Sequence, residues 1–311
     1  MLNIGSNINE VRVDGSLKAL QRDLSAFLGF RLTAAEISIH GLDAVKNGRL
    51  DCRRTSEIKT ILSDFPFRYS THAPNPLNLM GLDFPELHRN VLYASLEFSH
   101  AIDAKCMAYH PGRYLEEEKF GIRGPAYLTL QEKQDLLGHE AEILKEAADA
   151  FPGVIIAMEN ARPYLHHSPY CYAELPEELA KQIRRINRSN VLMTLDFGHL
   201  NLSARYYNLD AVAEIKAVAP FIVHCHVHDN FGRSVYYTEK TQTHQIPFGK
   251  GDSHMPVGWG AIPFHDLFAE FINEYNGLLI CELRSRYFEQ TGEAAENLAT
   301  ILQKQGVLLS R

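Results

Sequence analysis

Histidine and acidic side chains recur at the ends of short apolar segments along this sequence. In Val191 to Leu200, VLMTLDFGHL, an apolar run ends in Asp196, and His199 follows three positions later. A buried parallel strand that ends in this way delivers both side chains to the following loop, where they can bind a metal ion. An Asp-x-x-His pair alone is more often a turn acid beside a hydrogen-bonded histidine, so the pair gains weight only within a larger pattern.

The same arrangement occurs on six consecutive predicted strands. The residues at these strand ends are His72, His110, Glu159, Asp196 with His199, His226 and Glu282. Ionisable groups gathered at one end of a sheet repel and desolvate one another unless cations compensate them, which favours a metal cluster. Asp252 and His254, in GKGDSHMPVGWG, extend the set. Imidazole mixed with carboxylate suits zinc first, with manganese or iron also compatible.

Short apolar strands alternate with amphipathic helical segments, a pattern typical of repeated βα units and a parallel sheet. The predicted strands are Leu2 to Ser6, Ala35 to His40, Arg68 to His72, Lys105 to His110, Val154 to Glu159, Val191 to Asp196, Ile222 to His226 and Leu278 to Glu282. The predicted helices are Leu17 to Phe30, Pro85 to Ile102, Leu130 to Ala150, Pro176 to Ile186, Leu209 to Val218 and Pro263 to Glu274.

Eight strands favour a closed (β/α)8 TIM barrel over an open sheet. One barrel accounts for residues 1–311 as a single domain without a linker. Two long predicted loops, 111–129 and 230–263, would then lie at the C-terminal face, where barrel active sites are assembled.

Composition excludes several classes of protein. The chain is 45% hydrophobic and 22% charged, and no apolar run is long enough for a membrane span. The N-terminal residues lack a secretory signal, which predicts a cytoplasmic protein. Five widely spaced cysteines indicate buried thiols in a reducing compartment. A net charge of −7 with dispersed basic residues is not that of a dedicated nucleic-acid binder.

The strand-end motifs resemble those of the xylose isomerase-like TIM barrels, and within them those of the endonuclease IV group, AP endonuclease family 2. The motifs are His72 in THAPNPLNL, His110 in HPG, Glu159 in MEN, Asp196 and His199 in LDFGH, His226 in HVHD, Asp252 and His254 in DSHMPVGWG, and Glu282 in CEL. The resemblance implies up to three divalent ions. It assigns His72, His110 and Glu159 to one ion, Glu159, Asp196, His226 and Glu282 to a second, and His199, Asp252 and His254 to a third.

This resemblance leads first to a phosphoester hydrolase, in which Glu159 or Glu282 orients or deprotonates a water shared between ions. Sugar isomerases and epimerases among the relatives share only Glu159, Asp196, His226 and Glu282, with one metal and the two glutamates as acid and base. A non-catalytic sugar-binding barrel is a third interpretation. The segment after Glu159, NARPYLHHSPYCY, departs from the DNA enzymes. A small phosphorylated or sugar substrate is therefore favoured over DNA.

Four further residues are expected near the mouth of the barrel as substrate-binding side chains. They are Arg113, His166, His228 and Arg284. Each has a plain alternative as a surface residue or as a support for a ligand. His224, His226 and His228 alternate and so share one strand face, but only His226 has the spacing of the resembled motif. The metal partner of His199 separates the two enzyme interpretations, because in an isomerase His199 would touch substrate instead.

Overall fold

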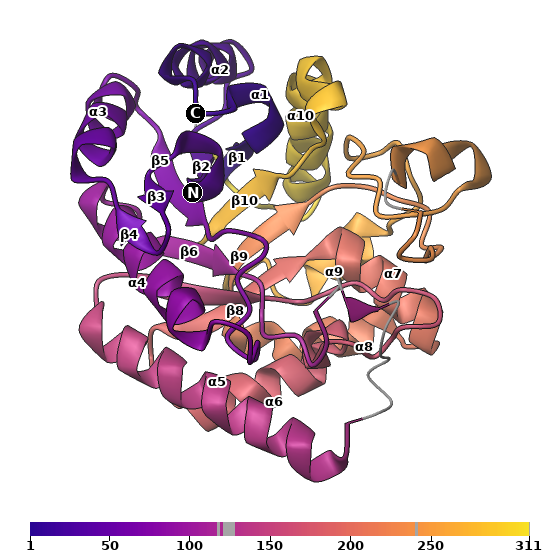
Figure 1. Cartoon of the computed structure of the whole chain (residues 1–311). Coiled ribbons are helices and arrows are strands. Elements are labelled where there is room, and N and C mark those ends of the chain that lie inside the picture. The colour runs from indigo at the N-terminus through magenta and orange to yellow at the C-terminus, as the bar shows by residue number, and fades with distance from the viewer. Residues whose placement is uncertain (117–118, 121–127, 240–241, 311) are drawn as a thin grey trace.

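Eight parallel strands close into a barrel in the computed structural model, which describes residues 1–116, 119–120, 128–239 and 242–310, without the side chains of 242 and 243. Around the barrel the order is β1, β10, β9, β8, β7, β6, β5 and β2 (Figure 1). Their bounds are β1 Asn3–Ile8, β2 Ala34–Ser38, β5 Arg68–His72, β6 Cys106–Tyr109, β7 Ile155–Glu159, β8 Val191–Asp196, β9 Ile222–Val227 and β10 Leu278–Cys281. This confirms the predicted TIM barrel.

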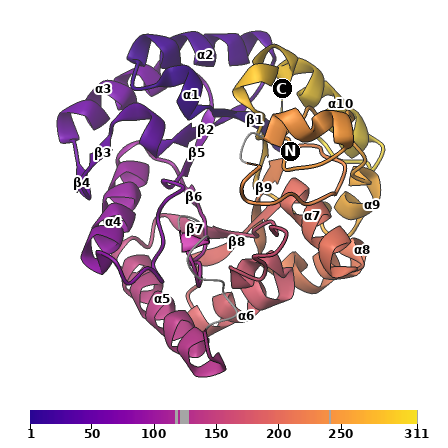
Figure 2. The same cartoon turned by 45° about the vertical axis from the view of Figure 1, so that its right-hand side comes forward.

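Helices form a ring outside the strands (Figure 2). They are α1 Glu10–Val13, α2 Leu17–Gly29, α3 Cys52–Ser63, α4 Pro85–Ala101, α5 Leu130–Ala150, α6 Pro176–Ile186, α7 Phe197–Tyr207, α8 Ala211–Val218, α9 Phe264–Ala269 and α10 Thr291–Gln303. Local sequence explains several ends: Thr129 and Glu132 form a capping box that starts α5, and Pro176 begins α6. The apolar faces of these helices pack on the outside of the barrel, as repeated βα units require.

The end of β8 differs from the sequence prediction. The chain does not enter a loop after Asp196, because α7 begins at the next residue. Asp196 is the N-cap of α7, and its Oδ1 accepts a hydrogen bond of 2.7 Å from the backbone N–H of His199. Oδ2 of the same carboxylate remains directed toward imidazole groups. The Asp-x-x-His spacing is therefore a strand-to-helix junction that holds both side chains in fixed positions.

Other elements were not predicted from the sequence. They are α1, α3, α10 and the two-stranded hairpin of β3 Val45–Lys46 and β4 Arg49–Leu50. The predicted helix from Pro263 to Glu274 is shorter, as α9 ends at Ala269. Of the predicted loop 111–129, residues 117–118 and 121–127 lie outside the described residues. The loop 230–263 contains a 3-10 helix, Gln242–Phe248, and residues 240–241 of it lie outside the description.

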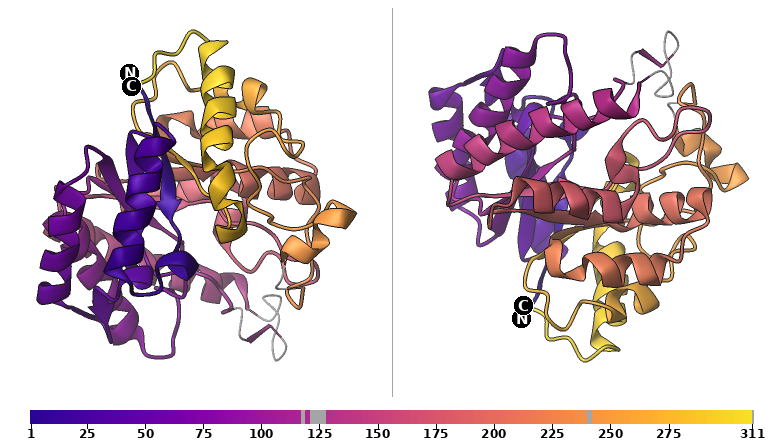
Figure 3. Two further views of the ribbon diagram at one scale, coloured as in Figure 1. Left: turned by 90° about the horizontal axis from the view of Figure 1, so that it is seen from above. Right: turned by 90° about the horizontal axis from the view of Figure 1, so that it is seen from below.

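The two ends of the chain lie side by side at the amino end of the barrel (Figure 3). Leu2 exchanges backbone hydrogen bonds with Leu308 and Ser310. This leaves the opposite, carboxyl end of the strands to the connecting segments that surround the predicted ligands. Among the described residues, no helix has the length and apolar character needed to cross a membrane.

Candidate metal centre

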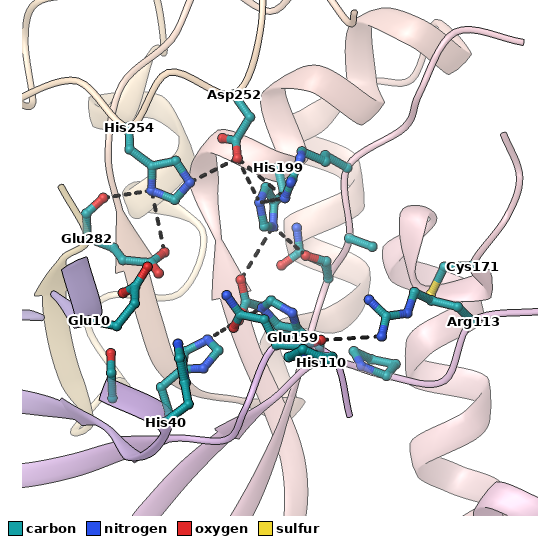
Figure 4. Close-up of a pocket in the computed structure, with 18 of the residues that line it drawn as sticks. Glu10, His40, His110, Arg113, Glu159, Cys171, His199, Asp252, His254 and Glu282 are labelled. Atoms are coloured by element: carbon teal, nitrogen blue, oxygen red, sulfur yellow. Dashed lines mark hydrogen bonds and ion pairs between the residues drawn. The ribbon is translucent and has the colours of Figure 1, made fainter. Parts of the chain in front are cut away.

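A cavity of about 580 Å³ lies at the carboxyl end of the barrel. Seven of the nine predicted ligands line it: His72, His110, Glu159, His199, Asp252, His254 and Glu282. Asp196 and His226 are fully buried. Figure 4 shows Asp252, His254 and His199 on one side of this cavity, with Glu159 and His110 across from them. Residues from strands far apart in the sequence thus converge on one space.

Glu159, the last residue of β7, lies at the centre of this group. Its side chain is 1% exposed. Oε2 is 3.5 Å from His72 Nε2, 3.3 Å from His110 Nε2 and 3.3 Å from His226 Nδ1, and Oε1 is 3.4 Å from His199 Nδ1. Within the described part of the chain, neither oxygen accepts a hydrogen bond of good geometry. A buried carboxylate left in this state needs a cation, so the donor set fits a metal ion.

Among the described residues, five groups of side chains have ligand atoms within 4.8 Å of one another, and three of these groups correspond to the predicted sets. The central cluster is Glu159, Asp196, His226 and Glu282. The His72 cluster is His72, His110 and Glu159, so it shares Glu159 with the central cluster. The Asp252 cluster is His199, His228, Asp252 and His254. These groups match the three sets drawn from the resemblance, with His228 added to the last.

Hydrogen bonds outside the clusters orient the imidazole rings. The rings donate from His72 Nδ1 to the Ala73 carbonyl (2.7 Å), from His199 Nδ1 to the Asn160 carbonyl (2.9 Å), from His226 Nε2 to Glu36 (2.9 Å), and from His254 Nδ1 to the Glu282 carbonyl (2.8 Å). Each bond fixes which nitrogen faces away from the clusters, so the other nitrogen becomes the ligand atom when a metal ion displaces its proton. Four rings therefore direct one potential ligand atom each toward the clusters.

Gly198 allows His228 to reach its place. A Cβ at Gly198, in the first turn of α7, would overlap the His228 ring. His228 Nε2 lies 3.1 Å from Asp196 Oδ2 and 3.8 Å from Asp252 Oδ1. The glycine of the LDFGH motif is thus required by close packing between α7 and the residue after β9.

The charges of the site hold its carboxylates ionised. Burial would raise the pKa of Glu159, but His226 and His110 outweigh it and keep that pKa well below 4.5. At Asp196, burial again raises the pKa, but His199 and His228 lower it by more, to about 2. At His72, burial lowers the pKa but Glu159 and Glu36 raise it to about 9. A metal ion would displace protons from such imidazoles, so its affinity should increase with pH.

Known proteins share this fold. The model of the xylose isomerase-like TIM barrel family matches residues 27–304. The chain belongs to this family. A search of curated protein sequences gave no significant match. The resemblance drawn from the strand-end motifs is thereby confirmed at the level of the xylose isomerase-like family, while the resemblance to the endonuclease IV group within it stays a prediction.

Several solved structures share the fold of this xylose isomerase-like barrel. A D-tagatose 3-epimerase-like protein is 18% identical, with a TM-score of 0.71 over 98% of this chain and 100% of that chain. An L-ribulose 3-epimerase is 14% identical, with a TM-score of 0.68 over 98% and 95%. A 3-keto-D-glucoside 4-epimerase from E. coli is 13% identical, with a TM-score of 0.69 over 97% and 100%.

All nine predicted ligands lie together, and their binding of metal stays a prediction. Of the four residues expected to bind substrate, Arg113 and Arg284 line the cavity. The other two lie elsewhere, and their binding of substrate stays a prediction. His228 is fully buried among the ligands and is not one of the cavity-lining residues described. His166 is not among the cavity-lining residues described, and its ring lies 4.9 Å from that of Tyr236.

Sequence reasoning missed residues that support the ligands. Glu36, in β2, is fully buried, and its carboxylate accepts hydrogen bonds from His226 Nε2 (2.9 Å), His224 Nε2 (2.7 Å) and Ser70 Oγ (3.0 Å). Arg162 and Asn160 follow β7 and contact His199. A glutamate inside the apolar run AAEIS was the available signal for Glu36, since a buried carboxylate requires partners.

Proposed function

We propose that this chain is a metal-dependent isomerase or epimerase of a small sugar, free or phosphorylated. The observation that carries the proposal is the central cluster, in which two glutamates meet at one imidazole. His226 Nδ1 lies 3.3 Å from Glu159 Oε2 and 3.4 Å from Glu282 Oε2. Both glutamates line a cavity of about 580 Å³, a volume within the range of small-molecule sites.

The two glutamates can move a proton at a carbon next to a carbonyl group. One carboxylate takes the proton from carbon, and the C–H electron pair moves toward the carbonyl oxygen to give an enediol-type species. The other glutamate then returns a proton to carbon, which yields the isomer or epimer. A divalent ion held by the central cluster would polarise the carbonyl and so acidify that C–H bond. Glu159 is ionised and lines the cavity, so its carboxylate can accept the proton in the first transfer.

The ligand chemistry limits the choice of ion. The central cluster offers three carboxylates and one imidazole, a set that suits manganese as well as zinc. Zinc or manganese is therefore the proposed ion of the central cluster.

The names of the structural neighbours support the sugar reaction over the phosphoester hydrolysis that the sequence first suggested. Hydrolysis remains a second candidate because of one observation, the two further clusters beside the central one. Two or three ions around Glu159 could together activate a water and stabilise a leaving oxygen. The substrate then would be a phosphoester.

Proton exchange with solvent tests the proposal across many sugars at once. Metal-loaded protein is incubated in D₂O with a panel of ketopentoses, ketohexoses and their phosphates, and deuterium at carbon is followed by NMR. We expect incorporation next to the carbonyl, with loss of it in Glu159→Gln and Glu282→Gln. Glu116→Gln is the matched control, because Glu116 lines the same cavity but pairs with Lys119.

Other results would lead to other functions. Release of phosphate from phosphoesters, with no exchange at any ketose, would establish the hydrolase. Binding of sugars by metal-loaded protein with neither reaction would favour the non-catalytic barrel.

A further inference from the structure

Arg162 lies against the Asp252 cluster. It follows Glu159 by three residues, lines the cavity, and has a side chain that is 23% exposed. Its Nη1 is 3.1 Å from His199 Nε2 and 3.3 Å from Asp252 Oδ2. The guanidinium thus contacts two of the four members of a cluster whose geometry could otherwise hold a metal ion.

The tautomer of His199 makes this contact significant. His199 Nδ1 donates its hydrogen to the Asn160 carbonyl, so Nε2 is the ring atom that can carry a lone pair. Nε2 is also the one atom through which this ring could bind an ion in the Asp252 cluster. Two N–H groups facing each other at 3.1 Å would repel, so the contact with Arg162 requires Nε2 to accept a hydrogen bond.

Arg162 and a metal ion compete for the same ligand atoms. Zinc binds imidazole nitrogen and carboxylate oxygen at about 2.0–2.2 Å, so an ion held by His199 Nε2 and Asp252 Oδ2 would lie beside the guanidinium. Arginine keeps its charge at any pH at which the protein is folded, and it has no lone pair to offer a metal. Two cations at this distance in a buried site repel each other strongly.

Surrounding aromatic rings hold the guanidinium in place. Arg162 Nη2 donates a hydrogen bond of 3.0 Å to the Tyr164 hydroxyl, and its guanidinium carbon lies 5.4 Å from the centre of that ring. Tyr164 is 4% exposed and packs against Tyr170 and Tyr237 at 5.5 and 5.6 Å between ring centres. Displacement of Arg162 by an ion would have to break these contacts as well.

We propose that the Arg162 guanidinium is the resident cation of the Asp252 cluster, and that metal binds only in the clusters that contain Glu159. The charge that a third ion would supply is built into the chain. The proposal rests on the metal binding of the proposed function and is independent of the sugar substrate.

Metal content and cobalt absorption test this assignment apart from activity. Wild-type protein and variants are loaded with excess Zn²⁺ or Co²⁺, freed of loose metal by gel filtration, and analysed by elemental analysis and visible spectroscopy. Arg162→Met keeps the length of the side chain but removes its charge and donors, and should bind about one further equivalent of metal with a new Co²⁺ band. Arg162→Lys, which keeps a cation, should match the wild type.

Two controls identify where the additional ion binds. Arg113→Met removes another cavity-lining arginine, whose described hydrogen bonds include those to the Asn75 and Leu77 carbonyls, and should leave metal content unchanged. Arg162→Met with Asp252→Asn should lose the additional equivalent. Circular dichroism confirms that each variant is folded.

The assignment is overturned if Arg162→Met has the metal content of the wild type. It is overturned equally if Asp252→Asn alone removes an ion from the wild-type protein, since the cluster would then already hold one beside Arg162. Neither result depends on whether ketoses exchange deuterium, so failure of the proposed function is distinguishable.

Discussion

Glu140 and Glu159 are both buried glutamates, yet their surroundings differ in kind. Glu140, on α5, is 0% exposed and accepts hydrogen bonds from the Tyr109 hydroxyl (3.0 Å), the Gly112 N–H (2.6 Å), the Tyr172 hydroxyl (2.7 Å) and the Gln182 amide (3.1 Å). Glu159 is 1% exposed, accepts no hydrogen bond of good geometry from the described residues, and faces four imidazoles. The two carboxyl groups are equally buried, but the groups that face them differ.

The difference separates a structural carboxyl group from a cation site. Neutral donors stabilise the Glu140 carboxyl group without a counter-charge, and burial, the largest influence, raises its pKa. Its bond to Gly112 ties α5 to the segment that follows His110. Glu159 stays ionised among rings that each can bind metal. The partners of a buried acid, more than its burial, therefore indicate its role.

Substitution of Glu159 should give the largest effect and is the strongest test of the difference between Glu159 and Glu140. Glu159→Gln should lower the activity by about 10²–10⁴-fold and reduce the metal content, because it removes a carboxylate shared by two clusters. In the metal-free state its stability should also fall near neutral pH, because the imidazoles that lower the pKa of Glu159 lose their counter-charge. Activity, elemental analysis and thermal unfolding of metal-free protein measure the three effects. An unchanged rate with a full metal load would contradict the assigned role.

Glu140→Gln should lower stability without any loss of metal. Its amide nitrogen would face donors in place of an acceptor, which should lower the free energy of unfolding by about 1–3 kcal/mol and leave metal content unchanged. Urea denaturation and elemental analysis measure both. Loss of metal in Glu140→Gln would contradict the assignment of Glu140 as a structural carboxyl group.

The pH dependence of stability sharpens this test. The pKa of Glu140 is raised in the folded protein above its ordinary value of 4.5, so the folded protein binds this proton more tightly than the unfolded chain does. The stabilisation from this group is fully present below pH 4.5 and is lost as the pH rises through the folded pKa. The deficit of Glu140→Gln relative to the wild type should therefore be largest in acid and shrink toward neutral pH. A deficit that grows with pH would show that Glu140 is ionised in the fold.

Glu36 is a third buried glutamate, and it combines both kinds of surroundings. It accepts the His226 Nε2 hydrogen and thereby leaves Nδ1 toward the central cluster. Glu36→Gln should weaken metal binding by about 10–100-fold, as is usual when the partner of a ligating histidine is changed. Competition with a chelator measures the affinity. Ser70→Ala, which removes only a donor to the other Glu36 oxygen, is the matched control and should have a smaller effect.

The residues that the sequence predicted correctly are those whose signal is local. Glu159 and Asp196 each end an apolar run, and His72 ends the predicted strand RYSTH. Because the barrel brings strand ends together, their meeting followed from the eight predicted strands. The bounds of β5 and β8 agree with prediction because polar residues delimit both strands.

The residues that were missed depend on closure of the barrel. Glu36 and His226 are 190 residues apart and face each other across the interior from β2 and β9, which are not neighbours in the sheet. The contact of Arg162 with Asp252 joins two connecting segments in the same way. The two strands of the β3–β4 hairpin have two residues each, too few for a periodic pattern. α7 was missed because the ligand pair at its start suggested a loop.

The smallest expected effect concerns one of the four donors to Glu140. Tyr172→Phe removes the hydroxyl that bonds to Oε2, and Gln182 still donates to that oxygen, so the free energy of unfolding should fall by about 1 kcal/mol. Tyr69→Phe, which removes a hydroxyl bonded to the Leu62 carbonyl, is the matched control away from Glu140. The cost of Tyr172→Phe should largely disappear in a Glu140→Gln background, because residues of one hydrogen-bond network are not additive. Equal costs in both backgrounds would mean that the Tyr172 hydroxyl stabilises the fold independently of Glu140, and the four donors would then not act as a unit.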